Sequence, residues 1–224
     1  MPDPRFDLIN RVLKALPTPL VGSVCYDGAK QTKTCTVKAF EAFADCYSLV
    51  RPRHVLEIGT HAGGSALMTL ALTDAAVLSV DIGHTWITPD HSFADWHVES
   101  SEGGLRQVER VLRATFGESR FSLLVGDSTA AETQLAIKLA NQLSPFDLAF
   151  IDGNHAYEYV TKDIAFARSL GIRWLIVDDL NSADGSDVAR AVQEAGLEVL
   201  REWTRIHSGG VSLGLTRDPN PPRM

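Results

Sequence analysis

Short apolar runs alternate with longer amphipathic stretches along most of the chain. The stretch FDLINRVLKAL, from Phe6 to Leu16, predicts an amphipathic helix, and a second helix is predicted from Val37 to Tyr47. The apolar runs predict strands at residues 54–58, 77–81, 121–125, 148–151 and 174–177. Because uninterrupted apolar strands are typical of a parallel sheet covered by helices on both faces, this alternation predicts an open α/β sheet.

The C-terminal part of the chain predicts a different pairing. Two strand candidates, residues 197–202 and 211–216, are separated by the turn-forming HSGG, so we expect an antiparallel hairpin at one edge of the sheet. No internal repeat, low-complexity tract or linker interrupts the sequence. The length of 224 residues suits one sizeable core, and we interpret residues 1–224 as one domain, with an N-terminal helical cap at 1–50 and an α/β core at 51–224.

The segment HVLEIGTHAGGSAL, residues 54–67, predicts a buried strand, a tight glycine turn and the start of a helix. Gly59 permits the sharp turn, Gly63 and the glycine after it leave room for a ligand or a neighbouring backbone, and Ser65 is a candidate helix cap. His61 stands where a dinucleotide-binding G-x-G-x-x-G turn requires its second glycine, and no Lys precedes Ser65 as in a phosphate-binding loop. We therefore expect a ligand with an adenosine part but no pyrophosphate. The alternative is that the turn only connects a strand to a helix.

Two downstream strands end on carboxylates. Asp81 closes the run VLSVD, about 20 residues after the glycine turn, where a carboxylate accepts hydrogen bonds from both ribose hydroxyls of a nucleotide. The run FSLLV is followed by Gly126, Asp127 and Ser128, which bring an acid and a hydroxyl to the end of another strand. Asp127 has a second interpretation, as the cap of the following helix, and the two roles are compatible.

These motifs, in this order, resemble those of the class I S-adenosylmethionine (SAM)-dependent methyltransferases. The resemblance implies a Rossmann-like, doubly wound sheet of seven strands, mostly parallel with an antiparallel C-terminal hairpin. It also implies that Asp127 lies against the adenine amino group and that Glu57 helps to hold the amino acid part of SAM. The alternative for Glu57 is a buried acid paired with a basic neighbour. The cofactor-binding residues that the resemblance implies are Glu57, Gly59, Thr60, His61, Gly63, Ser65, Asp81, Ile82, Asp127, Ser128 and Asp152.

Three carboxylates are expected at the ends of the next two strands. Asp152 follows the run FDLAFI and His155 lies three residues later, while Asp178 and Asp179 follow the run WLIV. Because clustered carboxylates repel one another and are costly to bury, they predict a cation, and ligation by oxygen alone favours Mg²⁺ or a similar hard ion. The predicted metal ligands are Asp152, Asp178 and Asp179.

This arrangement is similar to that of the metal-dependent O-methyltransferases, which include catechol-type enzymes and sugar-modifying relatives with a D-G-x-H motif, here residues 152–155. The resemblance covers residues 53–179. It implies that Mg²⁺ held in part by Asp152 positions an acceptor hydroxyl, and that His155, with an ordinary pKa of about 6.5, acts as the general base. The alternative for His155 is a helix cap or a more distant hydrogen-bonding residue. Catechol-type enzymes tend to have Lys here, so His155 favours a sugar or another natural product as acceptor.

The composition narrows the partners and the location. The net charge is −7 and Lys and Arg form no basic stripe, which argues against nucleic acid as the acceptor. The opening MPDPRFDLIN has no apolar signal-peptide core, and no window of about 18 uncharged apolar residues occurs, so we expect no membrane association and a cytoplasmic location. Cys25, Cys35 and Cys46 fit neither a disulfide framework nor a zinc site and are interpreted as free thiols.

Two segments are candidates for recognising a small-molecule acceptor. Residues 84–104 are too long for a simple connection, and their Trp86, Phe93 and Trp96 suit stacking on an acceptor as well as packing on the sheet. Residues 21–36 would cover the cofactor or form a solvated loop. The N-terminal helix is expected to pack on its own sheet or on that of a homodimer partner. Two other functions stay open, a nicotinamide-dependent oxidoreductase and a non-catalytic SAM-binding protein.

Overall fold

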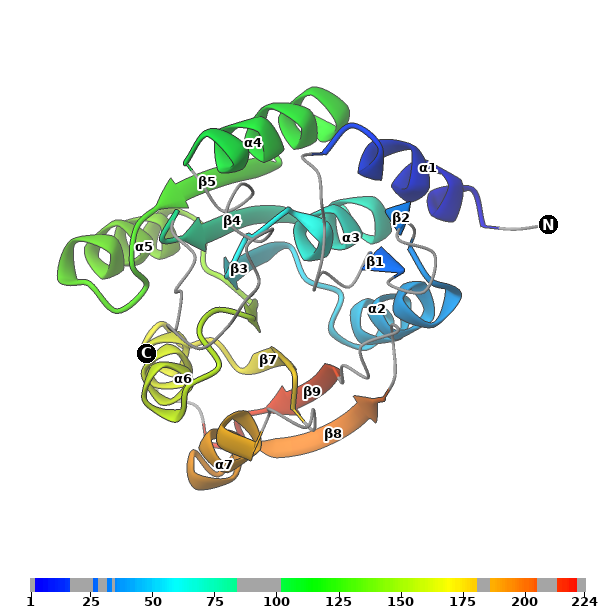
Figure 1. The fold of residues 1–224 in the computed structure, drawn as a ribbon. Helices are drawn as coiled ribbons and strands as arrows, with labels where there is room; N and C mark the ends of the chain where they lie inside the picture. The colour runs from blue at the N-terminus through cyan, green and yellow to red at the C-terminus, as the bar shows by residue number, and fades with distance from the viewer. Residues whose placement is uncertain are drawn as a thin grey trace, which may run out of the picture.

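A seven-stranded sheet forms the centre of the fold, with the strand order β5-β4-β3-β6-β7-β9-β8 (Figure 1). The computed structural model describes residues 3–16, 26–27, 32–33, 35–83, 102–180, 186–204 and 213–220. Strands β3 to β7 pair in parallel, whereas β9 runs antiparallel to both β7 and β8. Their bounds are β3 (His54–Ile58), β4 (Ala76–Asp81), β5 (Phe121–Val125), β6 (Leu148–Ile151), β7 (Trp174–Asp178), β8 (Glu198–Trp203) and β9 (Leu213–Arg217).

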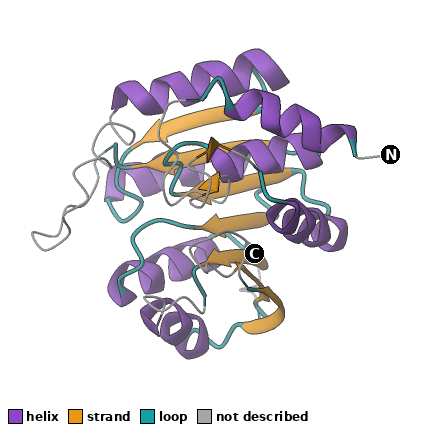
Figure 2. Cartoon of the chain, turned by 45° about the vertical axis from the view of Figure 1, so that its right-hand side comes forward, coloured by secondary structure: helices purple, strands orange, loops and turns teal. Residues whose placement is uncertain are grey.

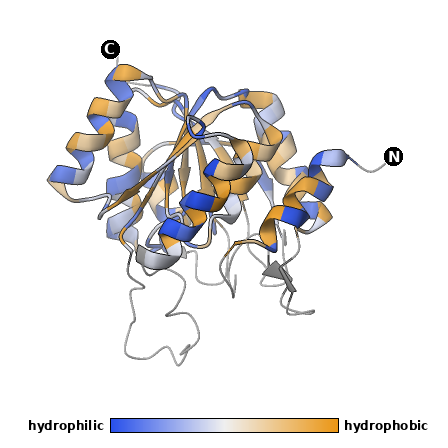
Figure 3. Cartoon of the chain, turned by 90° about the horizontal axis from the view of Figure 1, so that it is seen from above, coloured by the Kyte–Doolittle hydropathy of each residue, from blue (hydrophilic) through white to orange (hydrophobic). Residues whose placement is uncertain are grey.

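Helices cover both faces of the sheet, so that the strands lie between two helical layers when the molecule is seen from above (Figure 3). One layer consists of α1 (Pro4–Leu13), α2 (Val37–Val50), α3 (Gly64–Leu72) and α4 (Glu102–Phe116), and the other of α5 (Ala131–Leu143), α6 (Tyr157–Ser169) and α7 (Ser186–Glu194). Each layer shares a separate cluster of buried apolar side chains with the sheet. The doubly wound α/β fold predicted from the alternation of apolar runs is therefore confirmed.

Strand β3 shows why the sequence forms a parallel strand here. Val55 packs with the layer of α1 to α4, while Leu56 and Ile58 pack with the layer of α5 to α7. Because successive side chains of a strand point to opposite faces, a strand covered on both faces is mostly apolar, and Glu57 is the buried polar exception in β3. Val55 pairs in parallel with Val77 of β4 on one side and with Leu148 of β6 on the other.

The chain reverses its direction of winding at β3. From β3 it continues outward through β4 to β5, and it then returns to add β6 and β7 on the other side of β3. In open α/β sheets the crevice outside the carboxyl ends of the strands at such a reversal is the usual ligand site. A ligand site is therefore expected among the loops that follow β3, β4, β5, β6 and β7.

The predicted elements differ from the observed ones mainly at their ends. Helix α1 begins at Pro4, after Asp3 caps its first turn, and ends at Leu13 rather than at residue 16. Helix α2 continues three residues beyond the predicted end. The predicted C-terminal hairpin pairs as expected at the sheet edge, although its HSGG turn lies outside the described residues.

Two parts of the predicted loops contain regular structure. Within residues 21–36, β1 (Tyr26–Asp27) and β2 (Thr32–Lys33) form a small antiparallel sheet that the sequence did not predict. The end of the segment 84–104 belongs to α4, which begins at Glu102, while residues 84–101 lie outside the described part of the chain.

Helix α1 lies alongside α3 of the same chain and contributes to the core of its own sheet (Figure 2). The helix therefore packs on its own sheet, which is the first of the two predicted arrangements. Cys35 and Cys46 are free and buried as expected, and Cys25 falls outside the described residues. Within the residues described, no helix has the length and apolar character needed to cross a bilayer.

Candidate functional site

The glycine turn after β3 brings two neighbouring loops into close contact. Gly59 has a φ of 96°, and a Cβ added to it would lie 1.9 Å from the carbonyl oxygen of Asp152, which follows β6. The Gly59 N–H donates to the carbonyl of Val80 in β4 at 2.8 Å. Only glycine combines this backbone conformation with the absence of a side chain, so the turn can bridge the ends of β4 and β6.

Asp81 closes the turn from the end of β4. Its Oδ2 accepts hydrogen bonds from the backbone N–H groups of Thr60 at 3.0 Å and His61 at 2.8 Å, and its Oδ1 accepts from Gly83 at 2.9 Å. Ile82, predicted to contact the cofactor, follows directly and is half-buried. Asp81 thus holds the shape of the turn, a role that the sequence did not reveal. Its predicted bonds to ribose would use the remaining lone pairs.

Glu57 is a buried acid of β3 with 1% of its surface exposed. Burial is the main cause that raises its pKa to about 8, and hydrogen bonds from Ser65 and Ser79 offset only part of that effect. The Ser79 hydroxyl is also 2.6 Å from that of Thr60, so a chain of hydroxyls leads from Glu57 to the glycine turn. Among the described residues, the side chains that hydrogen-bond Glu57 are Ser65 and Ser79, and neither is basic.

The start of α3 corrects one prediction. The N-cap residue is Gly63, which has a φ of 78° and makes no side-chain capping bond, and Ser65 is the second residue of the helix. Ser65 hydrogen-bonds Glu57 instead of capping the helix. A Cβ on Gly63 would lie 2.5 Å from Val108 of α4, so this glycine is required by packing between helices.

Asp127 and Ser128 follow β5 and make different contacts. Asp127 Oδ1 accepts from the N–H and the hydroxyl of Thr129, both at 2.8 Å, and so closes the turn before α5. The N-cap of α5 is Ala130, so Asp127 caps this turn rather than the helix itself. The Ser128 hydroxyl donates to Asp163 Oδ1 at 2.7 Å.

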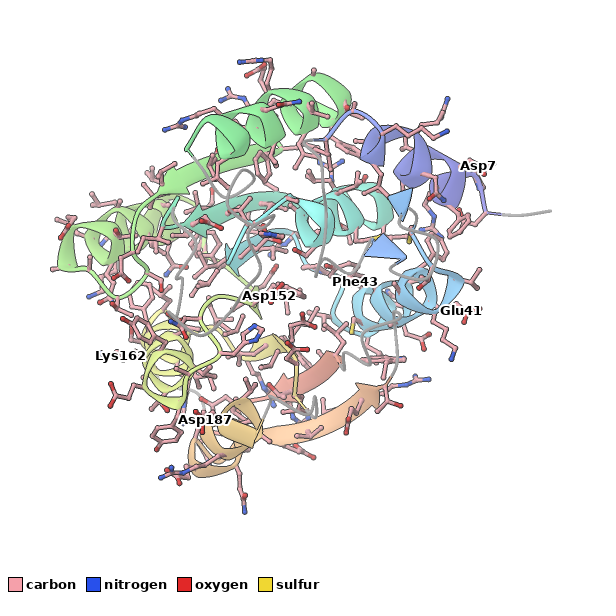
Figure 4. All side chains as sticks on the ribbon, in the orientation of Figure 1. Asp7, Glu41, Phe43, Asp152, Lys162 and Asp187 are labelled. Carbon is pink, nitrogen blue, oxygen red and sulfur yellow. The ribbon has the colours of Figure 1, made fainter. Side chains whose placement is uncertain are left out.

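An acidic cluster with one histidine lies where β6 and β7 end. Nε2 of His155 is 3.3 Å from Asp152 Oδ1, and its Nδ1 is 3.1 Å from Asp179 Oδ2. Asp179 has a φ of 54°, a left-handed conformation that Asp tolerates better than most residues, and it turns the chain directly after β7. Asp152 lies near the centre of the molecule in the view of Figure 4. The structure thus brings Asp152 and Asp179 together around His155, at the ends of β6 and β7.

The charges of this cluster depend strongly on one another. Burial, followed by the negative charges of Asp152 and Asp179, raises the pKa of Asp178 well above its ordinary value. Asp178 is 5% exposed, and its Oδ1 is buried without a hydrogen-bond partner among the described residues. Burial alone would lower the pKa of His155, but the hydrogen bonds to Asp152 and Asp179 outweigh it and raise that pKa to about 10.

The structure changes two expectations for the cluster, which concern the role of His155 and the arrangement of the carboxylates around a metal ion. An imidazole with this pKa is protonated at neutral pH, so His155 as arranged here is a cation between two carboxylates rather than a free base. It is not a helix cap, since α6 has Ala156 as its N-cap. In the described part of the chain, no group of three or more His, Cys, Asp or Glu side chains is arranged to hold a metal ion.

Sequence reasoning missed two polar residues behind the site. Ser79 interrupts the apolar run of β4, and Asp163 lies on the apolar side of α6 with Val160, Ile164 and Ala167. A polar residue on a buried face is a signal that was available in the sequence. Its hydrogen-bond partner was not available, because the partner comes from another loop.

Comparisons with known proteins identify the family of this fold. A family model described as "Methyltransferase domain" matches residues 56–179, which is more than half of the chain. A comparison with curated protein sequences gave no match.

Three solved structures share the fold at low sequence identity. The O-methyltransferase from Bacillus cereus in complex with SAH has a TM-score of 0.60 and 14% identity, covering 97% of this chain and 92% of that one. TomG from Streptomyces achromogenes, an O-methyltransferase involved in tomaymycin synthesis and bound to SAM, has a TM-score of 0.57, 14% identity and the same coverage. Cofactor-bound Rv0187 from MTB has a TM-score of 0.56 and 19% identity, covering 96% and 91%.

Proposed function

The chain belongs to the methyltransferase domain family, and we propose that this SAM-dependent methyltransferase transfers the methyl group to a hydroxyl oxygen of a small molecule. One observation carries the proposal: the cluster of Asp152, His155, Asp178 and Asp179 lies next to the glycine turn that Asp81 holds closed. A site for adenosine and a site for proton transfer are thus adjacent at one sheet edge.

The strand order supports one orientation of the cofactor along this edge. In this arrangement the ribose hydroxyls bind Asp81 at the end of β4, and the sulfonium points toward β3, β6 and β7, where the acidic cluster lies. The adenine is attached to the opposite side of the ribose and therefore extends toward β5, whose loop carries Asp127 and Ser128. Neighbouring strands are about 4.8 Å apart, so a molecule of the length of SAM spans these strand ends.

The chemistry asked of the protein is modest, because the sulfonium already activates the methyl group. The acceptor oxygen forms a bond to the methyl carbon while the carbon–sulfur bond breaks. The electron pair of the broken bond goes to sulfur, which gives S-adenosylhomocysteine (SAH). The acceptor proton passes to His155 once the imidazole is in its neutral form, and Asp152 and Asp179 orient its two ring nitrogens. Positioning the oxygen in line with the methyl group supplies the rest of the acceleration.

The chemistry of the carboxylates in the cluster also suits a divalent cation, although the described side chains are not arranged around a metal position. The three carboxylates supply only oxygen ligands, and Asp178 has a buried oxygen without a hydrogen-bond partner among the described residues. Mg²⁺ held by Asp152, Asp178 and Asp179 would supply the positive charge that protonated His155 supplies in the described arrangement, and would leave His155 free to accept a proton. This metal dependence is part of our proposal.

Calorimetric titration with SAH, with Mg²⁺ and again with a chelator, tests the cofactor assignment. We expect micromolar binding of SAH and no comparable binding of NAD, which would count against an oxidoreductase. Transfer of labelled methyl from SAM to a panel of sugars and catechols tests the reaction and separates an enzyme from a SAM-binding protein. We expect transfer to fall when the chelator is added.

Variants connect the reaction to the cluster. Asp152→Asn is expected to lower turnover by roughly 100-fold while SAH still binds, since it removes one of the two negative charges between which His155 is held. Asp7→Asn makes the same chemical change on α1 at the periphery of the molecule (Figure 4) and is expected to have no effect. Absence of SAH binding in both buffers would refute the proposed function.

A further inference from the structure

Asp163 of α6 is a buried carboxylate that the proposed reaction does not use. It is 2% exposed, and its Oδ1 accepts the hydrogen bond from the Ser128 hydroxyl at 2.7 Å. A Cβ added to Gly153 would lie 3.6 Å from its Oδ2, so Asp163 stands between the loop that follows β5 and the loop that follows β6. This carboxylate, costly to bury, hydrogen-bonds one of the two loops that would enclose one end of the cofactor and lies close to the other.

The hydrogen bond determines which polarity Ser128 offers to a ligand. A serine hydroxyl has one proton and two lone pairs, and an ionised carboxylate can only accept. Burial raises the pKa of Asp163 to about 6, so the group is mainly ionised at neutral pH and the Ser128 proton points to it. The backbone carbonyl of Ser128 is also engaged, by Gln134 Nε2 at 3.1 Å.

We propose that Asp163 is a positioning residue that fixes the Ser128 hydroxyl as a hydrogen-bond acceptor and thereby selects a 6-amino purine over a 6-oxo purine. The inference rests on the proposed function, in which the adenine extends toward the loop of β5. The exocyclic amino group of adenine has two N–H donors, so the Ser128 oxygen can accept from one of them beside the contact that the resemblance assigns to Asp127. The carbonyl oxygen at the same position of hypoxanthine is an acceptor, and two acceptors facing each other leave both groups unpaired.

The neighbours of Asp163 support this role over that of an ion pair. Lys162, the adjacent residue, is exposed on the outer side of α6, away from Asp152 and the strand ends (Figure 4). Its attraction for Asp163 is smaller than the effects of burial and of the Ser128 hydrogen bond. The hydrogen bond that the structure gives to this carboxylate comes from the Ser128 hydroxyl, in the loop that follows β5.

The test compares binding of SAH with that of S-inosylhomocysteine, in which a carbonyl oxygen replaces the amino group, by calorimetry. We expect the wild-type protein to prefer SAH by at least roughly tenfold, as for one mismatched buried hydrogen bond. In Asp163→Asn the amide can donate to Ser128 and release the hydroxyl proton. The preference is then expected to fall to about threefold or less.

Two further variants show whether Asp163 acts through Ser128. Ser128→Ala alone should reduce the preference, and adding Asp163→Asn to it should cause no further loss, because residues that act as one unit are not additive. Asp218→Asn removes the charge of another buried carboxylate, which pairs with Arg168 of α6 at 2.7 Å. It should lower stability and leave the preference unchanged.

The outcomes separate the two proposals. Wild-type protein that binds both ligands equally, or Asp163→Asn with the wild-type preference, would overturn the role of Asp163 and leave the proposed function standing. Equal loss of both ligands in Asp163→Asn would show a structural role only and would also overturn it. If Asp163→Asn does not fold, the test is the preference of Ser128→Ala for SAH over S-inosylhomocysteine. A preference equal to that of the wild type refutes the inference. Wild-type protein that binds no SAH overturns both proposals.

Discussion

Substitution of Gly59 by Ala tests whether the close approach of two loops builds the site. The substitution meets two separate obstacles. The φ of 96° is unfavourable for any side chain, and the new Cβ would lie 1.9 Å from the Asp152 carbonyl oxygen and 2.5 Å from its carbon. The backbone of the loop after β6 must therefore move by more than an ångström, or the glycine turn must open, and either movement displaces Asp152.

The expected loss of stability is the sum of a backbone cost and a packing cost. Placing a side chain at a left-handed position costs about 1 kcal/mol. Forcing extra atoms into a packed region costs about 1–3 kcal/mol more. We therefore expect Gly59→Ala to lower the free energy of unfolding by about 2–4 kcal/mol, measured by urea denaturation. The affinity of the folded protein for SAH should fall by roughly tenfold or more, as for the loss of one or two hydrogen bonds.

Gly117→Ala is a matched control. Gly117 has a φ of 106°, and a Cβ added there would meet nothing within 4 Å. It follows α4, outside the loops that form the site. This variant should show the backbone cost of about 1 kcal/mol alone and bind SAH normally. Equal destabilisation of the two variants, or normal SAH affinity in Gly59→Ala, would refute the reasoning from the close approach.

Three further predictions address other contacts. Asp81→Asn should lower SAH affinity by roughly tenfold in calorimetry, because an amide cannot accept all the bonds that Thr60, His61 and Gly83 donate; an unchanged affinity would contradict this. Glu57, whose pKa rises from 4.5 to about 8 on folding, binds its proton more tightly in the native state. The wild type should therefore lose stability relative to Glu57→Gln as pH rises from 5 to 8, by about 3.5 kcal/mol as an upper bound. A stability difference that stays constant across this pH range in urea titrations would disprove the prediction. Arg120→Ala should lower the free energy of unfolding by about 1–3 kcal/mol with SAH affinity retained, because its guanidinium donates to carbonyls at the end of α3.

Much of the fold could be read from the sequence because each strand carries its own local signal. The runs at His54–Ile58 and Phe121–Val125 appear as strands with the predicted bounds. Both runs are mostly apolar because helices cover both faces of the sheet, and this pattern is a property of each run alone. The two-residue strands β1 and β2 were missed, since segments this short carry no periodic pattern.

The candidate site was predictable in its members but not in their interactions. Polar residues at the carboxyl ends of successive parallel strands meet at one edge, so Asp81, Asp152 and Asp178 could be grouped in advance. The sequence did not indicate that Asp81 holds the glycine turn through backbone N–H groups. It also did not indicate that His155 would bridge two carboxylates, because such contacts depend on loop conformation.

The sequence by itself determined the order of the elements, the place of the glycine turn and the residue types at the strand ends, because these depend on local patterns and on the chain order. Only the tertiary structure decided the charge states and the partners, such as the protonation of His155 and the contact between Ser128 and Asp163. The physical reason is that a pKa and a hydrogen bond depend on burial and on distances of a few ångströms between segments far apart in the chain.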